Sequence, residues 1–164
     1  MKRVSHTLTY PGTTVDDVYA MLGDPAYRRA VGDYQRVVDL TCEISAEGAG
    51  MRVRLEEAHG TERIPSFARR LVGSEIRFVQ EEAWSSHSAA DIRVAIPGKP
   101  GDMSGTTTLT RAGADVVQQI ELAVKVSIPL VGGKVEDLVA GFMGKAFEAE
   151  HKVGTRWLRG EWRS

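Results

Sequence analysis

Hydrophobic and polar residues alternate along two stretches of the chain, residues 3–10 and residues 36–128. A two-residue period is typical of strands that bury one face. In the first stretch, every second residue from Val4 to Tyr10 falls on the more apolar face, and serine and threonine fill the other. This stretch therefore predicts a strand, which ends at Pro11.

Two short helices are predicted directly after this strand. Thr14 followed by Asp17 resembles a capping box, so a helix begins there. Asp24 is placed to cap a second helix, with Pro25 at its first position. Gly32 is expected to end that helix.

The second alternating stretch predicts about six further strands. The strongest of them runs from Val116 to Ile128, with apolar residues on one face and polar residues on the other, and Pro129 is expected to end it. Residues 61–73 interrupt the alternation and predict a short helix after Pro65. Residues 98–101 predict a hairpin turn and not a phosphate-binding loop.

A long helix is predicted at the end of the chain. Gly132 and Gly133 predict a tight turn, and an apolar stripe with helical spacing follows over residues 134–158. At ~1.5 Å per residue such a helix is about 40 Å long, so it must lay its stripe on the sheet. The pattern as a whole predicts a single α+β domain over residues 1–164, in which a curved antiparallel sheet of about seven strands wraps around this helix.

Composition narrows the class of protein. The 164 residues carry 21 Lys and Arg against 22 Asp and Glu, a net charge of -1, which argues against general nucleic-acid binding. Arg28 and Arg29, like Arg69 and Arg70, are interpreted as solvated surface residues. A single cysteine excludes an internal disulfide. No apolar stretch reaches the ~20 residues needed to span a bilayer, and the polar beginning of the chain favours the cytoplasm, with no stable membrane insertion.

Several segments carry a resemblance to a known family. They are Tyr10-Pro11 with Val15-Asp16-Asp17-Val18, Glu82-Ala83-Trp84, and the run from Val124 to Glu136 that joins the last strand to the long helix. These segments resemble an uncharacterised bacterial family of the START-like superfamily, which includes polyketide cyclases, pathogenesis-related plant proteins and lipid-transfer domains. The order of elements resembles the helix-grip fold of that superfamily over the whole chain. The resemblance implies a cavity between the concave sheet face and the long helix, often used for an apolar or amphipathic small molecule. It implies no catalytic motif.

Polar residues on predicted apolar faces are the candidate functional residues, because burying them without a partner is costly. Glu57 and His59 continue one apolar strand face, Gln80 and Glu82 continue another, and Glu150 falls inside the stripe of the long helix. If these faces point inward, the cavity has a polar belt, and a slip of one residue would turn each set outward. A carboxyl group facing a cavity could have a raised pKa and act as an acid or base. The predicted ligand-binding residues are Met51, Leu55, Glu57, His59, Phe78, Gln80, Glu82, Trp84, Met103, Phe142, Ala146 and Glu150.

Three functions remain open at this point. The leading one is a binding or carrier protein for a hydrophobic or amphipathic, lipid-like molecule. The second is a cyclase, dehydratase or hydrolase that uses Glu57, His59, Glu82 and Glu150. The third is a non-catalytic interaction domain, which could form a homodimer or bind a partner protein. Trp162 is then either a contact residue or part of a frayed tail. No metal and no cofactor are expected, because the four histidines are widely spaced and Cys42 lies in no motif.

Overall fold

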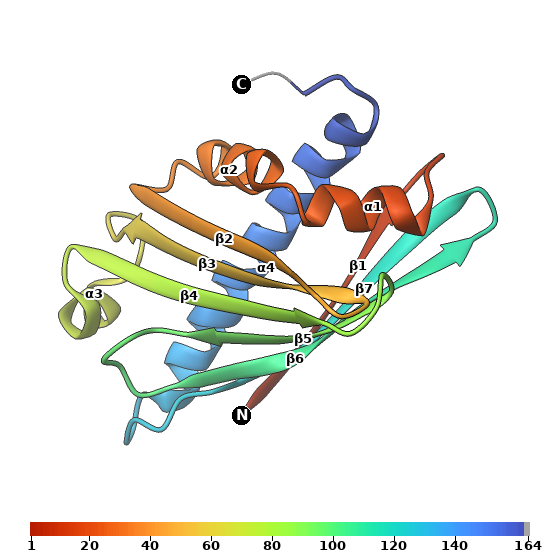
Figure 1. Ribbon diagram of the computed structural model, residues 1–164. Coiled ribbons are helices and arrows are strands. Elements are labelled where there is room, and N and C mark those ends of the chain that lie inside the picture. Colours follow the sequence, from red (N-terminus) through yellow and green to blue (C-terminus); the bar gives the residue numbers. More distant parts are fainter. Residues whose placement is uncertain (163–164) are drawn as a thin grey trace.

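The strands form one curved antiparallel sheet in the computed structural model of the chain, which describes residues 1–162 (Figure 1). The spatial order is β1-β7-β6-β5-β4-β3-β2, so the first strand pairs with the last, from Lys2 opposite Val124 to Tyr10 opposite Val116. The strands are β1 (Lys2–Tyr10), β2 (Asp39–Glu47), β3 (Gly50–Gly60), β4 (Glu75–Trp84), β5 (Ala89–Ala95), β6 (Asp102–Ala112) and β7 (Asp115–Lys125). The predicted α+β fold with seven strands is confirmed.

Three short helices and one long helix complete the fold: α1 (Val15–Leu22), α2 (Pro25–Tyr34), α3 (Ser66–Val72) and α4 (Gly132–Leu158). The predicted N-caps are confirmed, since Thr14 Oγ1 accepts a hydrogen bond from the Asp17 amide at 3.1 Å, and Asp24 Oδ1 accepts one from the Ala26 amide at 2.9 Å. The predicted end of the second helix at Gly32 is wrong. Gly32 lies inside α2, where an added Cβ would sit 3.1 Å from a methyl group of Leu40, so close packing explains this glycine.

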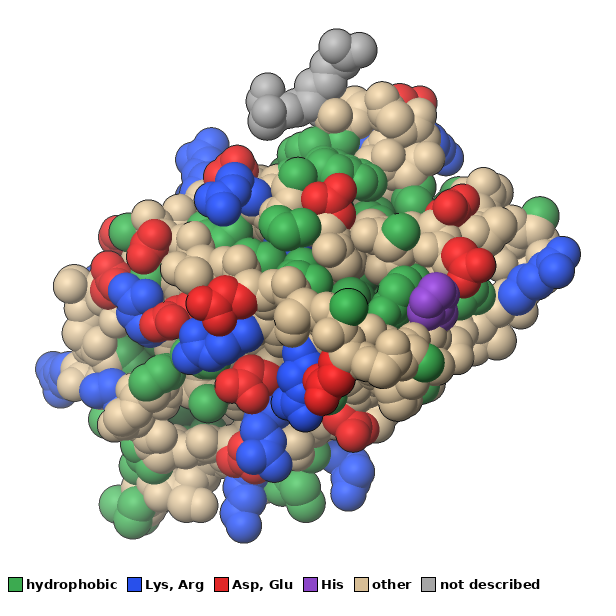
Figure 2. Space-filling view, viewed as in Figure 1, with side chains coloured by type: hydrophobic (Ala, Val, Ile, Leu, Met, Phe, Trp, Pro, Cys, Tyr) green, Lys and Arg blue, Asp and Glu red, His purple; other side chains and the backbone are tan. Residues whose placement is uncertain are grey.

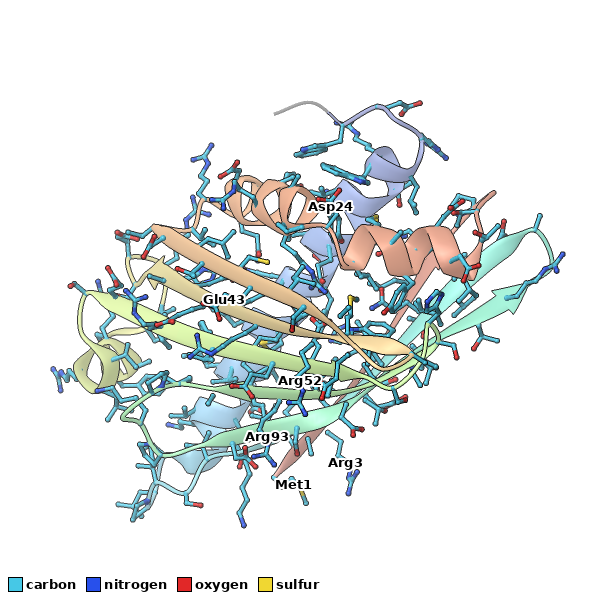
Figure 3. All side chains as sticks on the ribbon, viewed as in Figure 1. Met1, Arg3, Asp24, Glu43, Arg52 and Arg93 are labelled. Atoms are coloured by element: carbon cyan, nitrogen blue, oxygen red, sulfur yellow. The ribbon has the colours of Figure 1, made fainter. Side chains whose placement is uncertain are left out.

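The core lies between the concave face of the sheet and α4, which crosses it (Figure 1). Val139, Met143, Phe147 and Val153 of α4 are buried there, as the predicted stripe requires. The other face of the sheet carries charged side chains, among them Glu43, Arg52 and Arg93 (Figure 3), around an open hollow of about 940 Å³. The charged face explains the polar half of the alternation.

The corner between the sheet and α4 differs from the predicted one. β7 ends at Lys125, three residues before the predicted end, and Gly132 and Gly133 are the first residues of α4. The chain turns at Leu130 instead, whose φ is 70°. Gly132 is needed for a close approach, because a Cβ there would lie 2.7 Å from the carbonyl oxygen of Val126.

The end of the chain also differs from the interpretation as a frayed tail. Trp162 is partly buried against the core and its ring packs edge-on against that of Tyr34, with the ring centroids 6.1 Å apart. Its indole Nε1 is buried and has no hydrogen-bond partner among the described residues.

Candidate functional site

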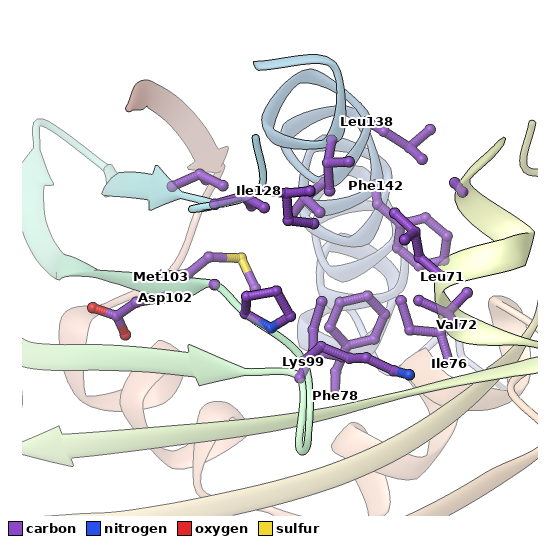
Figure 4. A pocket seen from close by; sticks show the side chains of 18 of the residues that line it. Leu71, Val72, Ile76, Phe78, Lys99, Asp102, Met103, Ile128, Leu138 and Phe142 are labelled. Atoms are coloured by element: carbon purple, nitrogen blue, oxygen red, sulfur yellow. The ribbon is translucent and has the colours of Figure 1, made fainter. Parts of the chain in front are cut away.

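An apolar cavity of about 230 Å³ opens at one end of the sheet. It lies between α3, the β5–β6 turn, the β7–α4 connection and the first half of α4 (Figure 4). Its walls are almost entirely hydrophobic, and the Lys99 side chain extends along the opening (Figure 4). The wall residues include Leu71, Val72, Phe78, Met103, Ile128 and Phe142.

A second, much smaller cavity of about 40 Å³ lies deeper between the sheet and α4. Glu57, His59 and Gln80 supply its polar groups, and Leu55 and Ala146 are among its apolar ones. His59 Nε2 lies 3.0 Å from Glu57 Oε2, so the two side chains form a hydrogen bond. The predicted polar belt thus faces inward, although its role in binding stays a prediction.

Three aromatic rings stand between the two cavities. Phe78 and Phe142 line both cavities, and His59 lines the small one. The ring centroids of Phe78 and Phe142 are 5.4 Å apart, that of His59 is 5.1 Å from Phe142 and 5.6 Å from Phe78. We call these three rings the aromatic partition. It closes the inner end of the apolar cavity.

A buried ion cluster lies beyond the small cavity. Arg28 donates from Nη1 and Nη2 to the two oxygens of Glu82 at 3.1 and 2.9 Å, and from Nε to the carbonyl oxygen of Leu22 at 2.8 Å. Trp84 Nε1 and Gln80 Nε2 also donate to Glu82, at 2.9 and 2.7 Å. Burial alone would raise the pKa of Glu82, but the charge of Arg28 and these hydrogen bonds outweigh it and hold that pKa below its usual value.

Glu150 is the second carboxyl group of this cluster. Its Oε1 lies 3.6 Å from Arg28 Nη1. Burial raises its pKa from 4.5 to about 7, against the favourable charge of Arg28 and with the help of the negative charges of Glu82 and Glu57. Glu150 is therefore poised between its two protonation states near neutral pH, and burial beside the ion cluster, not the predicted exposure to a cavity, is the cause.

Two buried tyrosines adjoin Glu150. The Tyr27 hydroxyl donates to the backbone carbonyl oxygen of Glu150 at 3.0 Å, and the Tyr10 hydroxyl has no hydrogen-bond partner among the described residues. Burial raises the pKa of both phenols, so both are neutral. They extend the polar interior without adding charge.

The structure divides the predicted site residues into two groups. Most of them line one or both cavities: Leu55, Glu57, His59, Phe78, Gln80, Met103, Phe142 and Ala146. The others, Met51, Glu82, Trp84 and Glu150, line neither cavity. Met51 and Trp84 belong to the packed core, and the two carboxyl groups are held by Arg28.

Arg28 corrects the interpretation of the Arg28-Arg29 pair as surface residues. Arg28 is buried, whereas Arg29 is exposed. The spacing from the buried residues Tyr27 and Val31 in α2 was the available signal, because Arg28 lies three residues before Val31 on the same helix face. Among residues 1–162, no group of three or more His, Cys, Asp or Glu is arranged to hold a metal ion.

Comparison with known proteins places the chain in a family. The model of the family described as "Protein of unknown function (DUF2505)" matches residues 5–158. The chain belongs to this family. The search of curated proteins finds no match for this DUF2505 member.

Solved structures share its fold at low identity. The Zhui aromatase/cyclase from Streptomyces sp. R1128 has a TM-score of 0.61 at 13% identity, covering 99% of this chain and 96% of its own. A START superfamily protein from Mycobacterium smegmatis has a TM-score of 0.58 at 15% identity, with 96% and 97% covered. Norcoclaurine synthase from Thalictrum flavum, solved in complex with dopamine and hydroxybenzaldehyde, has a TM-score of 0.60 at 15% identity, with 99% and 88% covered. The DUF2505 chain therefore has the START-like helix-grip fold, as predicted.

Proposed function

We propose that this protein binds an apolar or amphipathic small molecule in the cavity of about 230 Å³. The observation that carries the proposal is the nearly all-hydrophobic wall of a space that opens to solvent at one end. An engineered apolar cavity of about 150 Å³ binds benzene, so the space here is large enough for a molecule somewhat bigger than a single ring. Filling it removes apolar surface from water.

The shape of the site sets how an amphipathic ligand lies. The walls offer almost no polar partner, and the aromatic partition closes the inner end. A polar group left inside would lose its hydrogen bonds to water without replacement. The apolar body of the ligand therefore lies against Phe78 and Phe142, and its polar end stays at the opening near Lys99.

The fold is consistent with this function. Norcoclaurine synthase, which shares it, was solved with two small organic molecules bound. We apply that property to the DUF2505 chain only as part of the proposal. The predicted cytoplasmic location stays a prediction as well; none of the helices in the described part of the chain is long and apolar enough to cross a membrane.

The test is to fill the cavity with a larger side chain. Leu138→Trp places an indole in the apolar cavity from a partly exposed position of α4, and Val15→Trp adds the same group to α1 at a partly exposed position that lines neither cavity. Amide chemical shifts followed during titration with 1-octanol and 1-naphthol give the affinities. We expect at least about tenfold weaker binding to L138W, since a buried Leu-sized contact contributes about 1.5–3 kcal/mol, and unchanged binding to V15W. Binding of neither probe to the wild type would contradict the proposal.

A second candidate is acid–base catalysis, and one observation favours it. Glu57 and His59 are in hydrogen-bond contact and line the same small cavity, which is the arrangement that such chemistry requires. A space of about 40 Å³ is of the order of one water molecule, so a larger substrate reaches these residues only if the cavity widens, for example when the partition opens. A crystal structure of Phe142→Ala with 1-naphthol tests this. A naphthol hydroxyl bonded to His59 supports the candidate, and a ligand that stops at the partition removes it.

A further inference from the structure

Leu130 is an exposed apolar residue in an unusual conformation. Its side chain is 102% exposed and its φ is 70°, in the left-handed region that residues with a Cβ rarely occupy. It lies at the tip of the β7–α4 connection, two residues beyond Ile128, which lines the apolar cavity. A fully exposed leucine held in this way, next to the opening of a cavity, suggests contact with something apolar outside the protein.

A second exposed leucine lies across the opening. Leu71 of α3 lines the cavity and is 38% exposed. Three segments surround the opening: residues 61–73 with α3, residues 97–102 of the β5–β6 turn, and residues 126–134 of the β7–α4 connection (Figure 4). We call them the mouth segments.

The mouth segments are basic although the whole chain is not. They contain five basic residues, Arg63, Arg69, Arg70, Lys99 and Lys134, against two acidic ones, Glu62 and Asp102. Their net charge is thus +3, while the chain carries -1. None of the five basic residues forms an ion pair with a described residue. In Figure 2, basic side chains lie over α3 and hydrophobic ones over the β7–α4 connection, at the lower left.

We propose that the mouth segments dock on the surface of a lipid bilayer that contains anionic lipids. Leu130 and Leu71 enter the boundary between head groups and acyl chains, and the five basic residues face the lipid phosphates. Peripheral binding of this kind combines buried apolar area with attraction to anionic lipid. It needs no membrane-spanning segment. The cavity then opens toward the bilayer, which gives an apolar ligand a route that avoids water.

This docking goes beyond the proposed ligand binding and does not depend on it. Leu130 does not line the cavity, so its replacement leaves the site for 1-octanol intact. Leu138→Trp fills the cavity and leaves both exposed leucines in place. Membrane docking and ligand binding can therefore be tested independently of each other.

The test is sedimentation of the full chain with sucrose-loaded vesicles of pure phosphatidylcholine, and of phosphatidylcholine with 30% phosphatidylglycerol, at low and physiological salt. We expect binding to the anionic vesicles, weakened by salt. Leu130→Asn, which leaves the cavity wall unchanged, is expected to weaken it at least about tenfold. Asn tolerates the left-handed conformation at position 130, so the loop keeps its shape. Arg69→Gln with Arg70→Gln is expected to weaken binding about 30-fold, at roughly fivefold per charge.

Matched controls remove the same chemistry elsewhere. Val38→Ser replaces another exposed apolar residue, 64% exposed and outside the mouth segments. Arg29→Gln with Arg93→Gln removes two exposed charges of α2 and β5 that form no ion pair with a described residue. Both controls should bind like the wild type, and an equal loss in them overturns the proposal. So does the absence of binding to either vesicle. A concentration-dependent dimer that L130N abolishes, without vesicle binding, would assign the surface to a second copy of this chain.

Discussion

Arg28 of α2 and Glu82 of β4 form a two-point ion pair inside the protein, with N···O distances of 3.1 and 2.9 Å. Both side chains are almost completely buried. The pair is bonded further by Leu22, Trp84 and Gln80. It therefore fixes α2 against the sheet, and its polar groups are satisfied only as a set.

Removal of one partner leaves the other charge buried without a counter-charge. We expect Arg28→Met to lower the free energy of unfolding by about 3–5 kcal/mol, measured by urea denaturation. Arg29→Met, at the exposed neighbouring position, should change it by less than about 0.5 kcal/mol. The double variant Arg28→Met with Glu82→Met should be more stable than R28M alone, because the buried charge of Glu82 is removed together with its partner. Equal effects of R28M and R29M would show that the pair contributes nothing.

Glu150 makes stability depend on pH near neutrality. Its pKa of about 7 in the folded protein exceeds the ordinary 4.5, so the folded state holds a proton that the unfolded state releases. The stabilisation is present below about pH 4.5 and is lost as the pH rises through 7, by about 3 kcal/mol. Glu82 has a lowered pKa and contributes in the opposite direction, at pH values below this window.

The comparison of Glu150→Gln with the wild type isolates this effect. The introduced amide would keep the shape of the neutral acid and cannot ionise, so the variant should lack the loss of stability between about pH 5 and pH 8. Urea denaturation at the two pH values measures it. Exposed Glu148→Gln on the same helix is the control and should follow the wild type. A wild-type curve parallel to that of E150Q would contradict the raised pKa.

The sequence predicted the sheet, the caps of α1 and α2 and the long helix, because each rests on local periodicity or on a residue such as Thr14 or Asp24 with a definite conformational preference. It left two orientations open for Glu57, His59 and Gln80, inward or, after a slip of one residue, outward, and the structure has the inward one. It did not predict which inward residues line a space. Trp84 and Phe142 look alike in sequence, yet Trp84 packs edge-on against Tyr19 in the core and Phe142 lines both cavities.

The sequence also did not predict which residues far apart in the chain form contacts. The partner of Glu82 is Arg28, 54 residues away, and nothing local distinguishes Arg28 from its exposed neighbour except its place on the helix. The predicted position of the turn before α4 was wrong, because the two adjacent glycines were interpreted as the turn itself. Gly132 is required instead because α4 packs so closely against Val126 that a side chain at position 132 would collide with it.

Two glycines of α4 are expected to affect stability in opposite directions, one through side-chain packing and the other through the conformational freedom of the backbone. At Gly154 an added Cβ would lie 2.9 Å from a ring carbon of Tyr10 and 3.1 Å from the terminal methyl of Met21, whereas Gly141 has nothing within 4 Å. We expect Gly154→Ala to destabilise by about 1–3 kcal/mol through overpacking. Gly141→Ala should stabilise by about 0.5–1 kcal/mol, because alanine favours the helix. Melting curves of the two variants measure both changes in stability. Two changes in the same direction would contradict this view of α4.

Phe142 is expected to control how long a ligand the protein accepts. The ring of Phe142 stands between the two cavities, so Phe142→Ala joins them and lets an apolar chain pass the aromatic partition. We expect 1-dodecanol to gain affinity relative to 1-octanol in F142A, at a cost in stability of about 3 kcal/mol. Phe147→Ala removes a buried ring that lines neither cavity, so it should cost at least as much stability without changing the preference. A preference shifted equally in F147A would mean that general loosening of the core, and not the partition, sets ligand length.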